Sequence, residues 1–162
     1  MIRLVNDEDA RAVADIYNYY VINTAVTFEE EPLEPSDMLE RFNDIHEADL
    51  PWLVIEHEDV VSGFAYASKW KGRCAYRHSV EVTVYLSHEA KGLGLGSRLY
   101  SELFKRLRVK NIHVALGGIS LPNDASIALH EKFGMSKVAH FSEVGYKFGQ
   151  WVDVAYWQAK LS

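Results

Sequence analysis

Cysteine, proline and long apolar runs are all scarce in this sequence of 162 residues. Cys74 is the only cysteine, so no disulfide can form within the chain, and nothing favours an oxidising compartment. Without a specialised electrostatic environment a lone cysteine is usually a small packing residue, and we expect that of Cys74 rather than a nucleophile. No apolar run approaches the roughly 18 residues of a membrane span, and acidic residues precede any apolar segment of the signal-peptide kind. We therefore expect a cytoplasmic protein with no membrane partner.

Basic charge is scarce as well. The chain has 17 Lys and Arg against 23 Asp and Glu, a net charge of −6, and no block of Lys or Arg. Proteins that bind nucleic acids carry a basic face, so we expect no nucleic-acid partner.

His-Glu pairs begin at His46, His57, His88 and His130, but none has the second His of the H-E-x-x-H zinc pattern. We expect no metal.

The sequence does contain a regular succession of strand and helix patterns. The expected elements are a strand at Ile2–Val5, a helix capped by Asn6 or Asp7, a helix capped by Ser36 or Asp37, a hairpin of "WLVIEH" and "VVSGFAYASKW", a strand at Ser79–Ser87, a helix from Gly96, a strand "IHVALGGI", a helix from Asn123 to Gly134 and two closing strands. The order β-α-α-β-β-β-α-β-α-β-β predicts an α+β protein with one mixed, mostly antiparallel sheet and helices on both faces (α/β/α). We expect a single domain over residues 1–162, neither a Rossmann half nor a barrel.

The stretch "KGLGLGSRLY" (Lys91–Tyr100) places three alternating glycines between a predicted strand and a predicted helix. Their G-x-G-x-G spacing fits neither the G-x-G-x-x-G dinucleotide fingerprint nor the G-x-x-x-x-G-K-[ST] P-loop. A merely tight turn usually needs only one or two glycines. Alternating glycines at this junction let consecutive N–H groups converge beside the positive end of the helix dipole. The stretch therefore predicts an anion-binding loop suited to a pyrophosphate.

The same stretch resembles the acetyl-CoA pyrophosphate loop of the GNAT acetyltransferase superfamily, whose pattern is Gln/Arg-x-x-Gly-x-Gly/Ala. Lys91, Gly94 and Gly96 occupy this pattern, and Lys91 departs from the usual Gln or Arg while keeping a cation. The blocks "WKGRCAYRHSVEVTVY", "LPNDASIALHEKFGM" and "GYKFGQWVDVAYWQ" are similar to the phosphinothricin acetyltransferases, which also act on methionine sulfoximine. This resemblance runs from about Ile2 to the end of the chain. It implies the GNAT acyl-CoA N-acyltransferase fold, acetyl-CoA as co-substrate and an activity of the herbicide-resistance type.

The resemblance also implies which residues contact the coenzyme. It assigns the pyrophosphate to the glycine loop, and the thioester and pantetheine to backbone N–H groups at the end of the preceding strand. It further assigns the coenzyme arm to the start of the next predicted helix, where Asn123 also fits a helix cap. The implied set is Val84, Tyr85, Leu86, Lys91, Gly92, Leu93, Gly94, Leu95, Gly96, Ser97, Asn123 and Ser126.

Two residues are candidates for the chemistry of acetyl transfer, in which an ammonium loses a proton and a thiolate gains one. Glu81 lies on the strand before the glycine loop and matches the Glu of the phosphinothricin family's strand motif. Its apolar neighbours favour a pocket that raises its pKa over a solvated strand face. The role of general base that we expect for it is implied mostly by the family resemblance. His130 in "LHEKFG" stands where most GNAT members carry a Tyr that serves as acid. It is either an acid toward the thiolate or a packed helix histidine.

The acceptor is expected to be a small amino acid with a second acidic group. The loop "KWKGRCAYRHS" concentrates positive charge in an acidic protein, and Arg guanidinium groups grip carboxylate or phosphinate groups in bidentate fashion. The alternative is a solvated basic loop. The family resemblance favours substrate contacts, and the candidates are Phe28, Arg73, Tyr76, Arg77 and, more weakly, Lys147.

The sequence thus predicts an acetyl-CoA-dependent N-acetyltransferase that acts by direct transfer on the α-amine of a phosphinothricin- or methionine-sulfoximine-like amino acid. The alternatives are another small amine or a protein N-terminus as acceptor, a non-catalytic acyl-CoA-binding module, and a nucleotide-binding regulator. The apolar segment "WVDVAYW" and the family's common dimeric state predict a homodimer.

Overall fold

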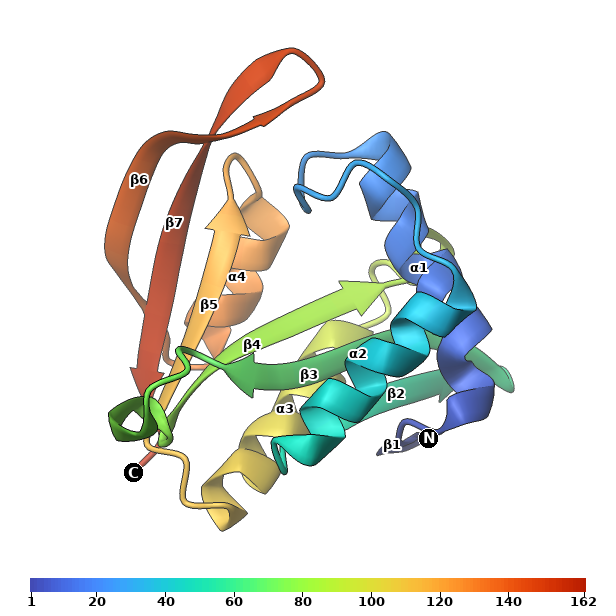
Figure 1. Cartoon of the computed structure of the whole chain (residues 1–162), viewed down its shortest axis with the longest axis horizontal. Helices are drawn as coiled ribbons and strands as arrows, with labels where there is room; N and C mark the ends of the chain where they lie inside the picture. Colours follow the sequence, from blue (N-terminus) through green and yellow to red (C-terminus); the bar gives the residue numbers. More distant parts are fainter.

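A seven-stranded sheet with helices on both faces forms the centre of the computed structural model, which describes residues 1–162 (Figure 1). Its elements in chain order are β1 (Ile2–Leu4), the 3-10 helix η1 (Asp7–Asp9), α1 (Ala10–Asn23), α2 (Pro35–Glu47), β2 (Trp52–His57), β3 (Val60–Lys69), η2 (Cys74–Tyr76), β4 (Ser79–Leu86), η3 (His88–Ala90), α3 (Leu95–Val109), β5 (Val114–Ser120), α4 (Asp124–Lys132), β6 (Ser136–Lys147) and β7 (Gln150–Lys160). The predicted α+β class and the predicted order of strands and helices are confirmed.

The sheet has the strand order β1-β2-β3-β4-β5-β7-β6, and every neighbouring pair is antiparallel except β4 and β5. The parallel pairing of β4 with β5 covers only Ser79–Glu81 against Val114–Leu116. Beyond these residues β4 runs on to Leu86 and β5 to Ser120, and Figure 1 shows the two strands diverging. The sheet is therefore open at its centre, on the side where both strands end.

Two apolar cores lie on the two faces of the sheet. On one face α3 presents Leu99, Leu103 and Leu107 at helical spacing, all fully buried, to a cluster of 20 buried residues. On the other face α1 and α2 cover a cluster of 13 that includes Phe42 and Trp52. Burying one such side chain contributes about 1.5–3 kcal/mol, so both faces fix the strands firmly up to the point where β4 and β5 part. None of the helices combines the length and the apolar character that a membrane crossing requires.

Helix starts differ in detail from the sequence predictions. The predicted cap of α2 at Ser36 or Asp37 is wrong, because the helix begins at Pro35 after Glu34. Proline suits the first helical position since its missing N–H would have no partner there. Asp37 still serves this end, because its Oδ2 accepts a hydrogen bond from the Glu34 N–H at 2.8 Å. The predicted cap at Asn123 is confirmed, since its Oδ1 accepts from the Ser126 N–H at 3.2 Å.

Candidate active site

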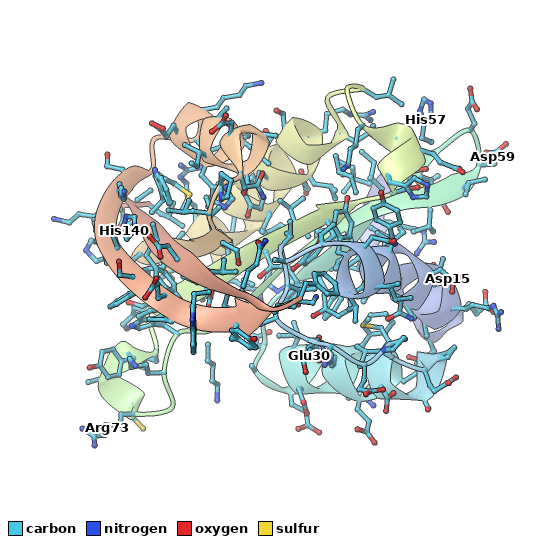
Figure 2. The ribbon with its side chains drawn as sticks, turned by 90° about the horizontal axis from the view of Figure 1, so that it is seen from above. Asp15, Glu30, His57, Asp59, Arg73 and His140 are labelled. Carbon is cyan, nitrogen blue, oxygen red and sulfur yellow. The ribbon has the colours of Figure 1, made fainter.

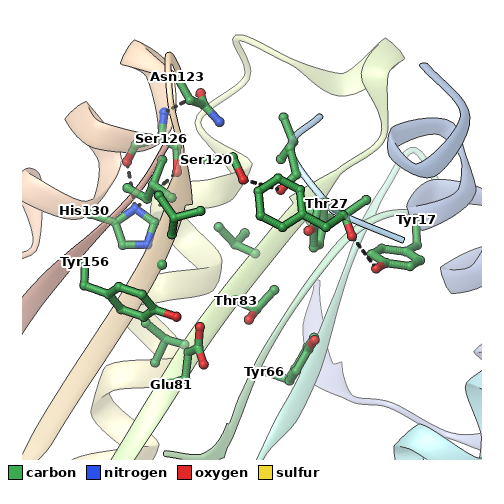
Figure 3. A pocket seen from close by; sticks show the side chains of 18 of the residues that line it. Tyr17, Thr27, Tyr66, Glu81, Thr83, Ser120, Asn123, Ser126, His130 and Tyr156 are labelled. Atoms are coloured by element: carbon green, nitrogen blue, oxygen red, sulfur yellow. Dashed lines mark hydrogen bonds between the residues drawn. The ribbon is translucent and has the colours of Figure 1, made fainter. Parts of the chain in front are cut away.

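A cavity of about 530 Å³ opens where β4 and β5 part (Figure 3). Its walls come from β4, β5, α4, the β6–β7 hairpin and the segment between α1 and α2. A second cavity of about 310 Å³ borders the glycine loop. The two cavities are adjacent, because both are lined by Val26, Val84, Tyr85, Asn123 and Ser126.

Glu81 lies in the first cavity at the last paired position of β4, opposite Leu116 of β5. Burial raises the pKa of Glu81, and no hydrogen bond or neighbouring charge offsets that shift. A half-buried carboxyl group without an intramolecular partner is available to a ligand in the cavity. Beyond Glu81 the β5-facing edge of β4 has no partner strand, so alternate backbone N–H groups up to Leu86 face the gap.

Tyr156 of β7 shares this cavity with Glu81 and was missed by the sequence analysis. Figure 3 shows its hydroxyl turned toward the Glu81 carboxyl group. Both side chains lie close to Gly118 of β5. A Cβ at Gly118 would lie 3.0 Å from Cζ of Tyr156 and 3.2 Å from Oε1 of Glu81. Burial and the Glu81 charge raise the pKa of Tyr156, which keeps its phenol neutral.

The adjacent Gly117 makes room for His130 in the same way. A Cβ at Gly117 would lie 2.6 Å from Cδ2 and 2.7 Å from Nε2 of His130. Two successive glycines inside a strand mark a place where other groups approach the backbone closely. The dipeptide in "LGGI" was therefore the one sequence feature that could have located this part of the site.

His130 is buried and held as a neutral ring. Its Nδ1 lies 2.7 Å from the Ser126 carbonyl oxygen, which can only accept, so Nδ1 carries the proton. Nε2 is then an acceptor, and the Tyr100 hydroxyl at 3.0 Å donates to it. Burial lowers the pKa of His130 and outweighs the hydrogen bond to Ser126. Tyr100 is fully buried and also lines the cavity, and it too was missed because its helical spacing resembled core packing.

The glycine loop joins η3 to α3 with left-handed backbone at two residues. Gly92 and Gly94 have φ of 80° and 74°, and open space surrounds the positions where a Cβ would stand. Their need for glycine is therefore conformational, and it leaves the backbone accessible at the start of α3. Lys91 holds its Nζ 5.5 Å above the Tyr20 ring at the edge of the second cavity.

The predicted coenzyme-binding residues fall into two groups. Those that line the second cavity are Val84, Tyr85, Leu86, Lys91, Gly92, Gly96, Asn123 and Ser126. Leu93, Gly94, Leu95 and Ser97 lie in the same loop and helix start but do not line it. Leu93 is half exposed, whereas Leu95 is buried in the core.

The predicted acceptor residues are more scattered. Phe28 lines the first cavity, but Arg73, Tyr76 and Arg77 lie on the exposed loop between β3 and β4 and do not. Figure 2 shows Arg73 at the tip of that loop, pointing away from the body of the chain. Lys147 is buried, and its Nζ donates to the Thr27 carbonyl oxygen at 2.8 Å. The chain has no group of three or more His, Cys, Asp or Glu side chains placed to hold a metal ion.

Comparison with known proteins places this geometry in a family. The family description "Acetyltransferase (GNAT) domain" matches residues 2–156. The phosphinothricin N-acetyltransferase of Streptomyces viridochromogenes is 44% identical over 160 residues, which are 97% of this chain and 85% of that protein. The L-methionine sulfoximine/L-methionine sulfone acetyltransferase of Salmonella typhimurium is 34% identical over 160 residues, 99% of this chain and 94% of that protein.

A solved structure shows the same similarity in three dimensions. It is a GNAT superfamily phosphinothricin acetyltransferase from Sinorhizobium meliloti in complex with acetyl-CoA, with a TM-score of 0.96 and 35% sequence identity. The match covers 100% of this chain and 88% of that one.

The buried, neutral His130 makes the stability of the fold depend on pH. Its ring resonances in NMR spectra should titrate below the usual histidine value of about 6.5. As pH falls below about 6.5, His130 is protonated in the unfolded chain at a higher pH than in the folded one. The unfolded state is therefore favoured, and the free energy of unfolding falls as pH decreases. The difference between wild type and His130→Gln in denaturant titrations at pH 7.5 and 5.5 isolates this contribution. Titration of His130 at or above the usual value would contradict the neutral, hydrogen-bonded ring.

Proposed function

The chain belongs to the GNAT acetyltransferase family, and we propose that it transfers the acetyl group of acetyl-CoA to the α-amine of an amino acid of the phosphinothricin or methionine sulfoximine type. The observation that carries this proposal is Glu81, an unpartnered carboxyl group with a raised pKa beside the gap between β4 and β5. The relatives named for these two substrates support the choice of acceptor. We take residues 1–162 as one catalytic domain that acts in the cytoplasm.

The coenzyme is proposed to lie along the end of β4. The glycine loop would receive the pyrophosphate through backbone N–H groups beside the start of α3, as helix N-termini do for phosphates. The unpaired N–H groups of β4 beyond Glu81 would bond the pantetheine arm and the thioester oxygen, which becomes negative as the amine attacks. Because the two cavities adjoin, an arm laid along this path brings the acetyl group to the cavity that holds Glu81.

Glu81 is proposed to be the general base. An α-ammonium is mostly protonated at neutral pH, and only the free amine attacks the thioester carbon. Glu81 would accept that proton directly or through a water, and its raised pKa brings it closer to the operating pH. The amine then forms the C–N bond as the C–S bond breaks and the thiolate departs.

His130 is proposed to act through Tyr100. Its single ring proton is committed to Ser126, and its Nε2 accepts from the Tyr100 hydroxyl. The lowered pKa leaves few rings with a proton on Nε2 at neutral pH, so His130 would be a poor reservoir for the thiolate's proton. The ring would instead hold the Tyr100 hydroxyl in place at the cavity wall.

Arg73, Tyr76 and Arg77 are proposed to meet the acceptor from a second copy of the chain. Their loop lies outside the cavity of its own chain, so substrate contact requires a homodimer. An exposed apolar surface on the β6–β7 hairpin supports such a contact and adjoins the cavity, because Phe141 and Val144 belong to both. Its other exposed members are Val138, Tyr146, Phe148 and Trp151.

Thiol release from acetyl-CoA, measured with a panel of acceptors, tests the proposed function. We expect kcat/KM to be highest for phosphinothricin and methionine sulfoximine, lower for methionine, and lowest for simple primary amines and for peptides with free N-termini. The basic loop accounts for this order, because only the first two acceptors offer an additional polar group for bidentate Arg contacts. Activity confined to peptides or simple amines would contradict the proposed acceptor, and coenzyme binding without transfer to any amine would contradict an enzyme.

Glu81→Gln removes the proposed base while keeping its size. We expect kcat to fall by about 10²- to 10⁴-fold with acetyl-CoA binding unchanged in calorimetry. The wild-type rate should rise with pH through the raised pKa of Glu81, and the variant should lack that ionisation. Glu131→Gln, on the exposed face of α4, is the matched control and should be silent. Retention of most activity by Glu81→Gln at neutral pH would place the base elsewhere.

Gly94→Ala tests the coenzyme loop through backbone strain alone. Alanine at φ 74° costs about 1–2 kcal/mol in the left-handed region, and nothing within 4 Å obstructs its methyl group. If the free loop relaxes to relieve that strain, acetyl-CoA affinity should fall roughly 5- to 30-fold. Gly134→Ala is the matched control, because Gly134 has φ 78° and equally open surroundings after α4. Equal coenzyme affinity in both variants would argue against the loop as the pyrophosphate site.

A further inference from the structure

Lys147, the last residue of β6, is a buried lysine without a carboxylate partner. Only 2% of its surface is exposed, which is exceptional for a side chain that carries a charge. Glu29, one of the two carboxylates whose charge acts on Lys147, is paired with Arg41 instead. Burying an ammonium group in this way lowers the stability of the fold unless hydrogen bonds compensate. The contacts of the Lys147 ammonium group therefore indicate the role of this residue.

The one side-chain hydrogen bond of Lys147 crosses from the β6–β7 hairpin to the segment between α1 and α2. Its Nζ donates to the Thr27 carbonyl oxygen at 2.8 Å, between residues 120 positions apart in the sequence. The Phe148 ring lies 5.1 Å from Nζ and covers it. Burial lowers the pKa of Lys147, and the more distant Glu29 and Glu30 oppose that shift.

The segment that Lys147 holds is a wall of the first cavity. Val26, Thr27 and Phe28 all line it. The Thr27 hydroxyl is 2.7 Å from the Tyr17 hydroxyl, and the Ser120 hydroxyl donates to the Val26 carbonyl oxygen at 3.4 Å (Figure 3). The wall is thus tied to α1, to β5 and, through Lys147, to β6.

Phe28 is the side chain whose place depends most on this attachment. The tip of its ring lies against Gly145, two residues before Lys147, where a Cβ would fall 2.2 Å from its Cζ. A ring in that position fills the space between Val26–Phe28 and the hairpin, and it lines the cavity that also holds Glu81. Gly145 and Lys147 therefore act on the same wall. Gly145 leaves space for the Phe28 ring, and Lys147 donates a hydrogen bond to Thr27.

We propose that Lys147 is a positioning residue for the acceptor, which fixes Val26–Phe28 as the acceptor-side wall and contacts no substrate itself. The inference rests on the proposed acetyl transfer and names what shapes its acceptor cavity. It differs from the substrate contact expected from the sequence, since Nζ is committed to Thr27 and Lys147 does not line the cavity. A misplaced wall would misorient the amine relative to the thioester without affecting the coenzyme loop.

Lys147→Met, which keeps length and apolar packing but loses the donor, tests this role. We expect kcat/KM for the amino acid to fall roughly 10- to 100-fold, mainly through KM, since misplacement by about 1 Å has effects of that size. KM for acetyl-CoA should stay within about twofold, and Lys147→Gln, which retains a donor, should recover part of the loss. Lys160→Met, an exposed lysine at the end of β7, is the control and should be silent.

Hydrogen exchange of the ligand-free proteins separates the possible outcomes. Faster exchange of residues 26–29 in Lys147→Met, with the rest of the sheet unchanged, supports the positioning role. A higher acceptor KM without any change in that exchange would mean direct substrate contact and would overturn the proposal, as would equal changes in both KM values. If Lys147→Met does not fold, Gly145→Ala displaces Phe28 instead and should raise only the acceptor KM. A wild type that acetylates no amino acid would refute the proposed function, while the exchange measurement would still test the attachment.

Discussion

The site depends on one feature of the sheet: β4 and β5 stop pairing well before either strand ends. Three residue pairs join the strands, and after Glu81 and Leu116 they diverge while the rest of the sheet stays paired. This divergence leaves β4 with unpaired N–H groups beside the cavity, in the middle of the sheet, whereas a continuously paired sheet has such an edge only at its outer strands. It also makes the cavity, whose floor is the last paired residue, Glu81. The coenzyme and the acceptor are proposed to meet at the same break.

The buried polar groups around this break differ in whether they have a hydrogen-bond partner. His130 is kept neutral between Ser126 and Tyr100, and Lys147 is satisfied by the Thr27 carbonyl oxygen. Glu81 alone has no partner, so its carboxyl group carries the unrelieved effect of burial. The two cores on either side of the sheet supply the stability that such an arrangement requires. A hydrogen-bond or ion-pair partner for Glu81 would stabilise its charged form, which would lower its pKa and make it a weaker base.

The parts of the molecule that follow local rules were predictable from the sequence. Apolar spacing and caps gave the order of strands and helices, and the alternating glycines indicated the loop before α3. Tyr17, Tyr100 and Tyr156 were not found, because their spacing is that of core residues and only the fold brings them to one cavity. Contacts across 94 to 120 residues, such as Ser120 with Val26 or Lys147 with Thr27, leave no local pattern. Composition identified the basic loop around Arg73 but could not show that the loop lies outside the cavity of its own chain.

The most direct test of this account is the pKa of Glu81 in the ligand-free enzyme. Carbon-13 NMR of glutamate carboxyl groups gives it, with Glu81→Gln identifying the resonance. The account predicts titration clearly above the ordinary range of glutamate, because burial at the break between β4 and β5 disfavours the charge and nothing nearby restores it. Titration at or below the ordinary value would mean that the carboxylate is solvated or paired. The break would then offer no tuned base, and the proposed mechanism would fail.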